Sequence, residues 1–243
     1  AALLPVSRLK QGREWELEHK RTICGYCGVG CGIDFRTKGN RIVYAQGYPS
    51  APVNGEFLCA KGRFGWDYAN HPDRLTRPLV RRALLDELGI SAAAVGDGSA
   101  IPAAKAGKRG LVLSDAADFV PVAWDSALDI VAARLADTVK ADGPDAVAGL
   151  ASARCTNEEN YLFQKLMRAT VGTNNVDHCA RLCHASTVSG LGASFGSGAM
   201  TNPIRDIRDA DCILITGSNT AESHPVIGYE VVRAAKKGAN VVM

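Results

Sequence analysis

The feature that most constrains this chain is a group of four cysteines in its first quarter. Cys24, Cys27 and Cys31 are separated by two and three residues, and Cys59 follows after 27 more. A 4Fe–4S cluster needs four thiolates at the corners of a tetrahedron, and one tight loop can supply three of them. Zinc usually takes two cysteines from each of two knuckles. The three-plus-one spacing therefore predicts an iron–sulfur cluster, with a zinc site and free thiols as the alternatives.

A lysine lies close to the fourth cysteine. Lys61 follows Cys59 by two residues, in the sequence Cys-Ala-Lys-Gly. A cation at this point would offset the negative charge of a cluster and raise its reduction potential. By position alone, the favoured interpretation of Lys61 is a surface lysine.

The composition excludes several classes of protein. Of 243 residues, 47% are hydrophobic and 22% are charged, as in an ordinary globular chain. The net charge of +3 gives no reason to expect nucleic acid as a partner. No apolar run reaches the roughly 18 residues of a membrane span. Eight cysteines, four of them with ligand-like spacing, indicate metal binding in a reducing compartment.

The first third of the chain divides into three parts. Residues 1–20 are polar and aperiodic, which predicts a linker or a short helix. Residues 21–75 form the predicted cluster domain, with strands at 33–36 and 41–45 joined by a turn at Gly39 and Asn40. Residues 89–110 are rich in alanine and glycine, which predicts a surface insertion.

Helices and strands alternate in the remainder. The predicted elements are a helix at 124–141 capped by Asp125 or Ser126, a short buried strand at 146–151, a helix at 158–171 with Leu162, Leu166 and Met167 inward, a strand at 212–216, a helix at 226–237 closed by Gly238, and a strand from 239 to 243. This alternation predicts an α/β fold with a parallel sheet covered on both faces. We expect one α/β domain over 76–175, and the incomplete start of a second over 176–243.

Three segments carry a family resemblance. They are ICGYCGVGCGI with CAKGRFGWDY downstream, DHCARLCHASTVSGLGASFGSGAMTN at 177–202, and ADCILITGSNTAESHPVIG at 210–228. In this order they resemble the molybdopterin oxidoreductase family, and within it the N-terminal part of the catalytic (alpha) subunit of NAD-dependent molybdenum or tungsten formate dehydrogenases. The resemblance covers about 21–82 and 111–243. It implies a small 4Fe–4S domain followed by parallel-sheet α/β domains that bind pyranopterin guanine dinucleotide, in a chain that is truncated here.

The resemblance also implies site residues. Cys183 matches the protein ligand of the molybdenum or tungsten, and His184 matches the residue beside the substrate. Lys61 matches a lysine between the cluster and one pterin. Gly217, Ser218, Asn219, Glu222 and His224 fall in the stretch that contacts a guanine dinucleotide.

Other interpretations of these residues stay open. Without the resemblance, Cys183 could be a buried structural thiol, and the turn at 217–219 could bind nothing. A metal pair of Cys179 with Cys183 is conceivable. Cys155 and Cys212 are interpreted as small buried hydrophobes.

The implied reaction converts formate to CO2, a proton and two electrons. The electrons would pass through a pterin and the cluster, then through iron–sulfur and flavin/NAD-binding partner subunits to NAD. The alternatives are a nitrate reductase of the same family, a non-catalytic iron–sulfur electron-transfer subunit, and a zinc-stabilised interaction module. The arginine that grips formate in the family is expected beyond residue 243. We therefore expect a longer native chain, and no formate turnover from these residues alone.

Overall fold

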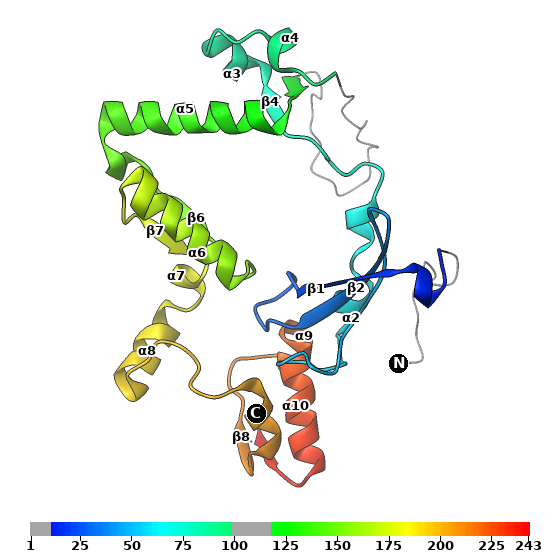
Figure 1. Ribbon diagram of the computed structural model, residues 1–243. Coiled ribbons are helices and arrows are strands. Elements are labelled where there is room, and N and C mark those ends of the chain that lie inside the picture. The colour runs from blue at the N-terminus through cyan, green and yellow to red at the C-terminus, as the bar shows by residue number, and fades with distance from the viewer. Residues whose placement is uncertain (1–10, 99–117) are drawn as a thin grey trace. The chain divides into compact units, whose positions relative to one another are not determined.

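The computed structural model describes residues 11–98 and 118–243 (Figure 1). These residues form two compact units. The first contains the chain up to Asp67 together with 150–164 and 176–243, and the second contains 68–149 and 165–175. No helix in the described ranges is long and apolar enough to cross a bilayer.

A three-stranded antiparallel sheet supports the cysteine loop. After the short 3-10 helix η1 (Glu14–Glu16) come β1 (Glu18–Ile23), β2 (Gly32–Lys38) and β3 (Arg41–Gln46), paired in the order β1-β2-β3. The predicted strands at 33–36 and 41–45 are thus confirmed, and Gly39 makes their turn with φ of +57°. The strand β1 was missed because its side chains are all exposed, which leaves no apolar alternation in the sequence.

The core beneath this sheet combines distant parts of the chain. Cys24, Cys31, Ile33 and Ala45 are buried together with Val226, which lies near the C-terminal end. The helix α2 (Ala60–Phe64) and the 3-10 helix η2 (Asp67–Asn70) follow the fourth cysteine.

The C-terminal part of the first unit consists of short elements and one longer helix. These are β7 (Val176–His178), α7 (Ala180–Cys183), α8 (Ala185–Phe195), η6 (Ile204–Asp209), β8 (Cys212–Leu214), α9 (Thr220–Ser223), α10 (Pro225–Lys236) and β9 (Asn240–Val242). The strands β8 and β9 are parallel, with Cys212 opposite Asn240. This β-α-β arrangement confirms the strand, helix and strand predicted from residue 212 onward, including the stop at Gly238, where φ is +107°.

The second unit has its own small core. Its elements are β4 (Leu79–Arg81), α3 (Arg82–Glu87), α4 (Ala92–Val95), β5 (Phe119–Pro121), α5 (Trp124–Asp142), η4 (Pro144–Ala146) and the π-helical turn η5 (Leu166–Val171). The strands β4 and β5 are antiparallel. Ala92 and Val95 of α4 pack against the core, so this part of the predicted insertion is not a bare surface loop. Residues 99–110 of that insertion lie outside the described residues.

The fold corrects the predicted cap of α5. Its N-cap is Ala123, which makes no side-chain cap, so the predicted caps Asp125 and Ser126 are wrong. Asp125 instead lies in the first turn, where a carboxylate interacts favourably with the helix dipole.

Burial was overestimated in the middle of the chain. The predicted helix at 158–171 is α6 (Asn157–Lys165) continued by η5, and within it Met167 is buried whereas Leu162 is 60% and Leu166 44% exposed. The strand at 146–151 shortens to β6 (Gly149–Ala151), in which Leu150 is 81% exposed. The described strands form one three-stranded and three two-stranded sheets. Apolar side chains such as Leu150 stay exposed on these narrow sheets. The parallel pairing that the sequence predicts is seen between β8 and β9.

Candidate cluster and cofactor site

Four cysteines predicted as cluster ligands line one cavity. Cys24 and Cys31 are buried, and Cys27 and Cys59 are half-buried. The cavity is completed by Tyr26, Val29, Leu58, Lys61, Gly62, Pro225 and Val226. The three-cysteine loop closes where the Cys24 backbone N–H donates to the Cys31 carbonyl over 2.8 Å. Cys59 reaches the same cavity as the N-cap residue of α2.

The two buried thiols of this cavity, Cys24 and Cys31, are costly to ionise. Burial, with a smaller contribution from the neighbouring cysteines, raises the pKa of the Cys31 thiol to about 12. Burial also raises the pKa of Cys24. Cysteine binds metal only as the deprotonated thiolate. Four negative thiolates crowded together therefore require a strongly positive centre. Apolar walls around four soft donors suit a 4Fe–4S cluster.

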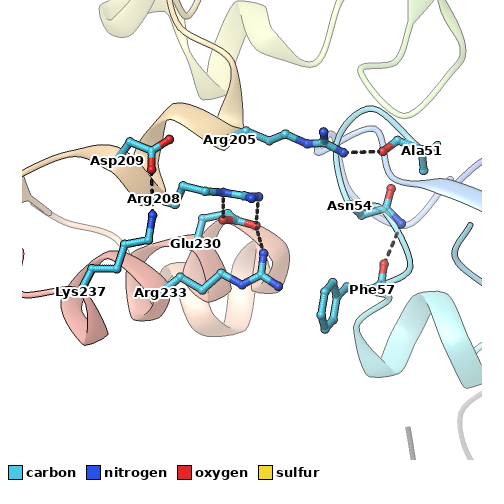
Figure 2. Close-up of polar contacts among 9 residues, drawn as sticks. All are labelled: Ala51, Asn54, Phe57, Arg205, Arg208, Asp209, Glu230, Arg233 and Lys237. Atoms are coloured by element: carbon cyan, nitrogen blue, oxygen red, sulfur yellow. Dashed lines mark hydrogen bonds and ion pairs between the residues drawn. The ribbon is translucent and has the colours of Figure 1, made fainter. Parts of the chain in front are cut away.

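A buried amide connects the segments that carry the third and fourth cysteines. The Asn54 side-chain oxygen accepts from the Gly32 N–H over 2.7 Å, and its nitrogen donates to the Gly32 carbonyl over 3.0 Å. The same nitrogen donates to the Phe57 carbonyl over 2.6 Å (Figure 2). Gly32 follows Cys31, and Phe57 precedes Cys59 by two residues. Sequence reasoning missed Asn54, since an Asn-Gly pair signals only a turn.

The predicted site residue Lys61 lies in the first turn of α2 and lines the cavity beside the cysteines, and the residue is exposed. This placement suits a cation that offsets cluster charge. Its role in electron transfer stays a prediction.

The predicted metal ligand and its neighbour lie outside that cavity. Cys183 ends α7, and His184 separates α7 from α8; both side chains are exposed. The Cys183 N–H donates to the Cys179 carbonyl over 3.2 Å. The Cys179 sulfur accepts from the Ala153 N–H over 3.4 Å. The helix that presents Cys183 is therefore connected to the loop after β6.

That loop forms a cleft with the cysteine loop. The cleft has a volume of about 340 Å³ and is lined by Ile23, Cys24, Cys27, Gly28 and Gly30 on one side and by residues 153–158 on the other. The sequence analysis did not predict it. The usable signal was that 153–158 follow the carboxyl end of a strand, where α/β sheets bind ligands.

Two cysteines differ from their predicted environment. Cys155 and Cys212, interpreted as buried hydrophobes, are both exposed. Cys155 lies in the turn after β6, and Cys212 begins β8 in a two-stranded sheet. No other element among the described residues buries either side chain, so the prediction of burial is wrong.

The predicted dinucleotide segment lies between β8 and α10. Gly217 has φ of +62°, a conformation that favours glycine. The Asn219 side chain caps α9 by accepting from the Glu222 N–H over 3.3 Å, and it donates to the Glu222 carboxylate over 3.1 Å. His224 is half-buried at the start of α10, and the next two residues line the cysteine cavity. The segment and the cavity are therefore adjacent along the chain.

Comparison with known proteins places this arrangement in a class. Residues 74–243 match the molybdopterin oxidoreductase family, and residues 17–71 match the Fe4S4 domain of molybdopterin oxidoreductases. The chain belongs to the molybdopterin oxidoreductase family. These two matches support a 4Fe–4S cluster and a molybdopterin cofactor carrying molybdenum or tungsten.

Individual relatives are similar over nearly the whole chain. F420-dependent formate dehydrogenase 1 subunit alpha of Methanococcus maripaludis is 42% identical over 94% of this chain and 28% of its own length. The probable oxidoreductase YjgC of Bacillus subtilis is 38% identical over all of this chain and 21% of its own length. The solved structure of acetylene hydratase from Pelobacter acetylenicus shares the fold, with a TM-score of 0.57 at 18% identity, over 91% of this chain and 26% of that one. The chain thus spans about a quarter of these proteins.

Proposed function

We propose that this chain is the N-terminal part of the catalytic subunit of a molybdenum- or tungsten-dependent formate dehydrogenase. The observation that carries the proposal is the 41–42% identity, over 94% of the chain, to proteins named as alpha subunits of formate dehydrogenases. The reaction is the oxidation of formate to CO2, a proton and two electrons.

The residues divide into three roles in this proposal. Cys24, Cys27, Cys31 and Cys59 hold the 4Fe–4S cluster, because they line a single cavity. Cys183 is the protein ligand of the molybdenum or tungsten, and the segment from Gly217 to His224 contacts a pterin guanine dinucleotide. The molybdopterin cofactor, when bound, supplies the two-electron redox chemistry.

Two further residues act around that chemistry. The His184 imidazole is exposed next to Cys183, where it can donate a hydrogen bond to a small carboxylate such as formate. Lys61 lines the cluster cavity, and its positive charge favours an electron arriving on the cluster. We place the domains as predicted, with the cluster domain at 21–75 followed by α/β domains at 76–175 and from 176.

The final acceptor of the electrons from formate is proposed separately. We propose that the electrons pass to partner subunits, since the relatives named above are alpha subunits. The sequence predicts NAD as the final acceptor, reached through iron–sulfur and flavin subunits in the cytoplasm. Relatives that carry F420 in their names make F420 the competing acceptor. Supplying each acceptor in turn to the complex purified from its native host would decide between them.

Formate oxidation is tested on the full-length protein, purified without oxygen and analysed for iron, molybdenum, tungsten and zinc. We expect an iron–sulfur cluster, one molybdenum or tungsten, and formate-dependent reduction of a viologen dye. The Cys183→Ala variant should keep its iron and lose this activity. Stoichiometric zinc without iron would refute the cluster. Nitrate consumption with reduced dye, in the absence of formate oxidation, would assign the nitrate reductase alternative.

A further inference from the structure

The loop that leads to the fourth cluster cysteine contacts α10 through an aromatic pair. Phe57 precedes Cys59 by two residues, and its ring centroid lies 4.9 Å from that of Tyr229 on α10. The guanidinium carbon of Arg233 lies 4.7 Å from the Phe57 centroid and 4.4 Å from the Tyr229 centroid. Phe57 is 46% and Tyr229 41% exposed. Both rings are partly exposed, and the Arg233 guanidinium adds a cation–π contact to each of them.

A buried carboxylate sets the position of that cation. Glu230 is 3% exposed, and it is paired with two arginines (Figure 2). Its Oε1 accepts from Arg233 Nη1 over 3.2 Å and from Arg208 Nη2 over 3.0 Å. Its Oε2 forms an ion pair with Arg208 Nε over 2.9 Å. A carboxylate in this environment is stable only when paired, so Arg233 is held in one orientation.

The 3-10 helix η6 contacts the other end of the loop. Arg205 of η6 donates from Nη2 to the Ala51 carbonyl over 2.8 Å (Figure 2). Val226 of α10 packs into the core that contains Cys24 and Cys31. The loop from Ala51 to Phe57 is therefore attached to η6 at its first residue and to α10 at its last.

We propose that Arg233, held by Glu230, is a positioning residue for Cys59: through Phe57 it fixes the loop that carries the fourth cluster thiolate. This inference rests on the proposed cluster on Cys24, Cys27, Cys31 and Cys59. The geometry of ligands and the charges around them set both the reduction potential of a cluster and its retention. Movement of the loop from Ala51 to Phe57 changes the position of the Cys59 thiolate directly. It reaches the preceding cysteine loop through Asn54, which bonds to Gly32 next to Cys31.

The test uses the full-length protein, purified without oxygen. Arg233→Met removes the charge and keeps the length of the side chain, Arg233→Lys keeps a charge, and Glu230→Gln releases Arg233. Lys237→Met is the matched control, because Lys237 follows the same helix and pairs with Asp209 over 2.8 Å, away from the loop. The readouts are the reduction potential of the cluster, measured by titration with electron paramagnetic resonance, and the rate at which a chelator removes iron.

We expect Arg233→Met to lower the reduction potential and to speed iron loss several-fold. Glu230→Gln should change both in the same direction, Arg233→Lys should recover part of each, and Lys237→Met should match the wild type. Phe57→Leu leaves the ion pairs intact and should also speed iron loss. If a destabilised Arg233→Met cannot be purified, Phe57→Leu decides.

The inference would be overturned if Arg233→Met had the reduction potential and the rate of iron loss of the wild type. If Arg233→Met cannot be purified, the same result in Phe57→Leu would overturn it. Absence of a cluster from the wild-type protein would instead refute the proposed function. A wild-type protein with a cluster but no formate activity would leave this test intact.

Discussion

Among single residues, Asn54 has the widest structural effect for its size. Its one side chain bonds to both backbone groups of Gly32 and to the carbonyls of Gly55 and Phe57. It therefore connects segments near Cys31 and Cys59, which are separated by 27 residues. Leaving buried backbone groups unpaired costs about 1–3 kcal/mol each.

Asn54→Ala should accordingly weaken the cysteine cavity by a few kcal/mol, since the Gly32 N–H loses its partner. The measurement is iron content after anaerobic purification, followed by the rate of iron removal by a chelator. We expect less iron and faster loss than in Asn40→Ala, a control in the exposed turn between β2 and β3. Equal iron retention in the two variants would contradict this role.

The cysteines should also differ in reactivity once iron is removed anaerobically. The thiolate is the reactive form, and the pKa of Cys31 is raised to about 12 by burial and neighbouring thiols. Cys31 is thus protonated below that pH, and its labelling by iodoacetamide should stay slow at pH 8 and accelerate as the pH rises. Exposed Cys155 should be labelled quickly at pH 8, as peptide mass spectrometry can measure. Equally fast labelling of both would show that the cavity does not persist without iron.

At the scale of elements, strongly patterned segments were predictable and unpatterned ones were not. The strands β2 and β3 are short segments with buried apolar residues and a glycine turn between them, and α10 is amphipathic with a glycine after it. Their positions therefore followed from the sequence. The exposed strand β1 gave no such signal. The four cysteines proposed as cluster ligands were singled out by their spacing, whereas Asn54, Arg233 and the cleft at 153–158 depend on contacts between distant segments. No local pattern predicts such contacts.

The helix α2 gives an element-level prediction, because its first turn presents Lys61 to the cluster cavity. Lys61→Ala in the full complex should slow electron transfer to the final acceptor, while formate still reduces the molybdenum or tungsten. Rapid-mixing spectroscopy separates the two steps. Arg63→Ala, on the same helix but not lining the cavity, serves as the control. An unchanged rate of electron transfer to the final acceptor in Lys61→Ala would show that Lys61 is an ordinary surface lysine.

At the scale of the whole molecule, the activity expected of residues 1–243 depends on how much of the relatives' length they cover. It spans 28% of the length of the Methanococcus maripaludis subunit. The second unit also has an apolar cleft of about 600 Å³ along α5 and η5, lined by Leu128, Val131, Leu135, Val139 and Leu166 among others.

Residues 1–243 expressed alone should therefore keep iron but show no formate-dependent dye reduction. The arginine expected to bind formate, and further cofactor contacts, are predicted outside this segment. The isolated segment should also bind a hydrophobic fluorescent dye more strongly, per mole, than the full-length protein, because the cleft on α5 is open. Measurable formate turnover by the segment would refute the expectation.

The burial of Val226 beside Cys24 and Cys31 has a consequence for how such proteins can be recombined. A boundary drawn after residue 71, where the match to the Fe4S4 domain ends, passes through a continuous hydrophobic core. A chimaera that joins this domain from one relative to the remainder of another would place two unmatched surfaces around the cysteines. Exchange should succeed only when residues 204–236 are inherited with the domain. The part of this protein that can be exchanged as a unit is therefore made of two separate segments of the chain.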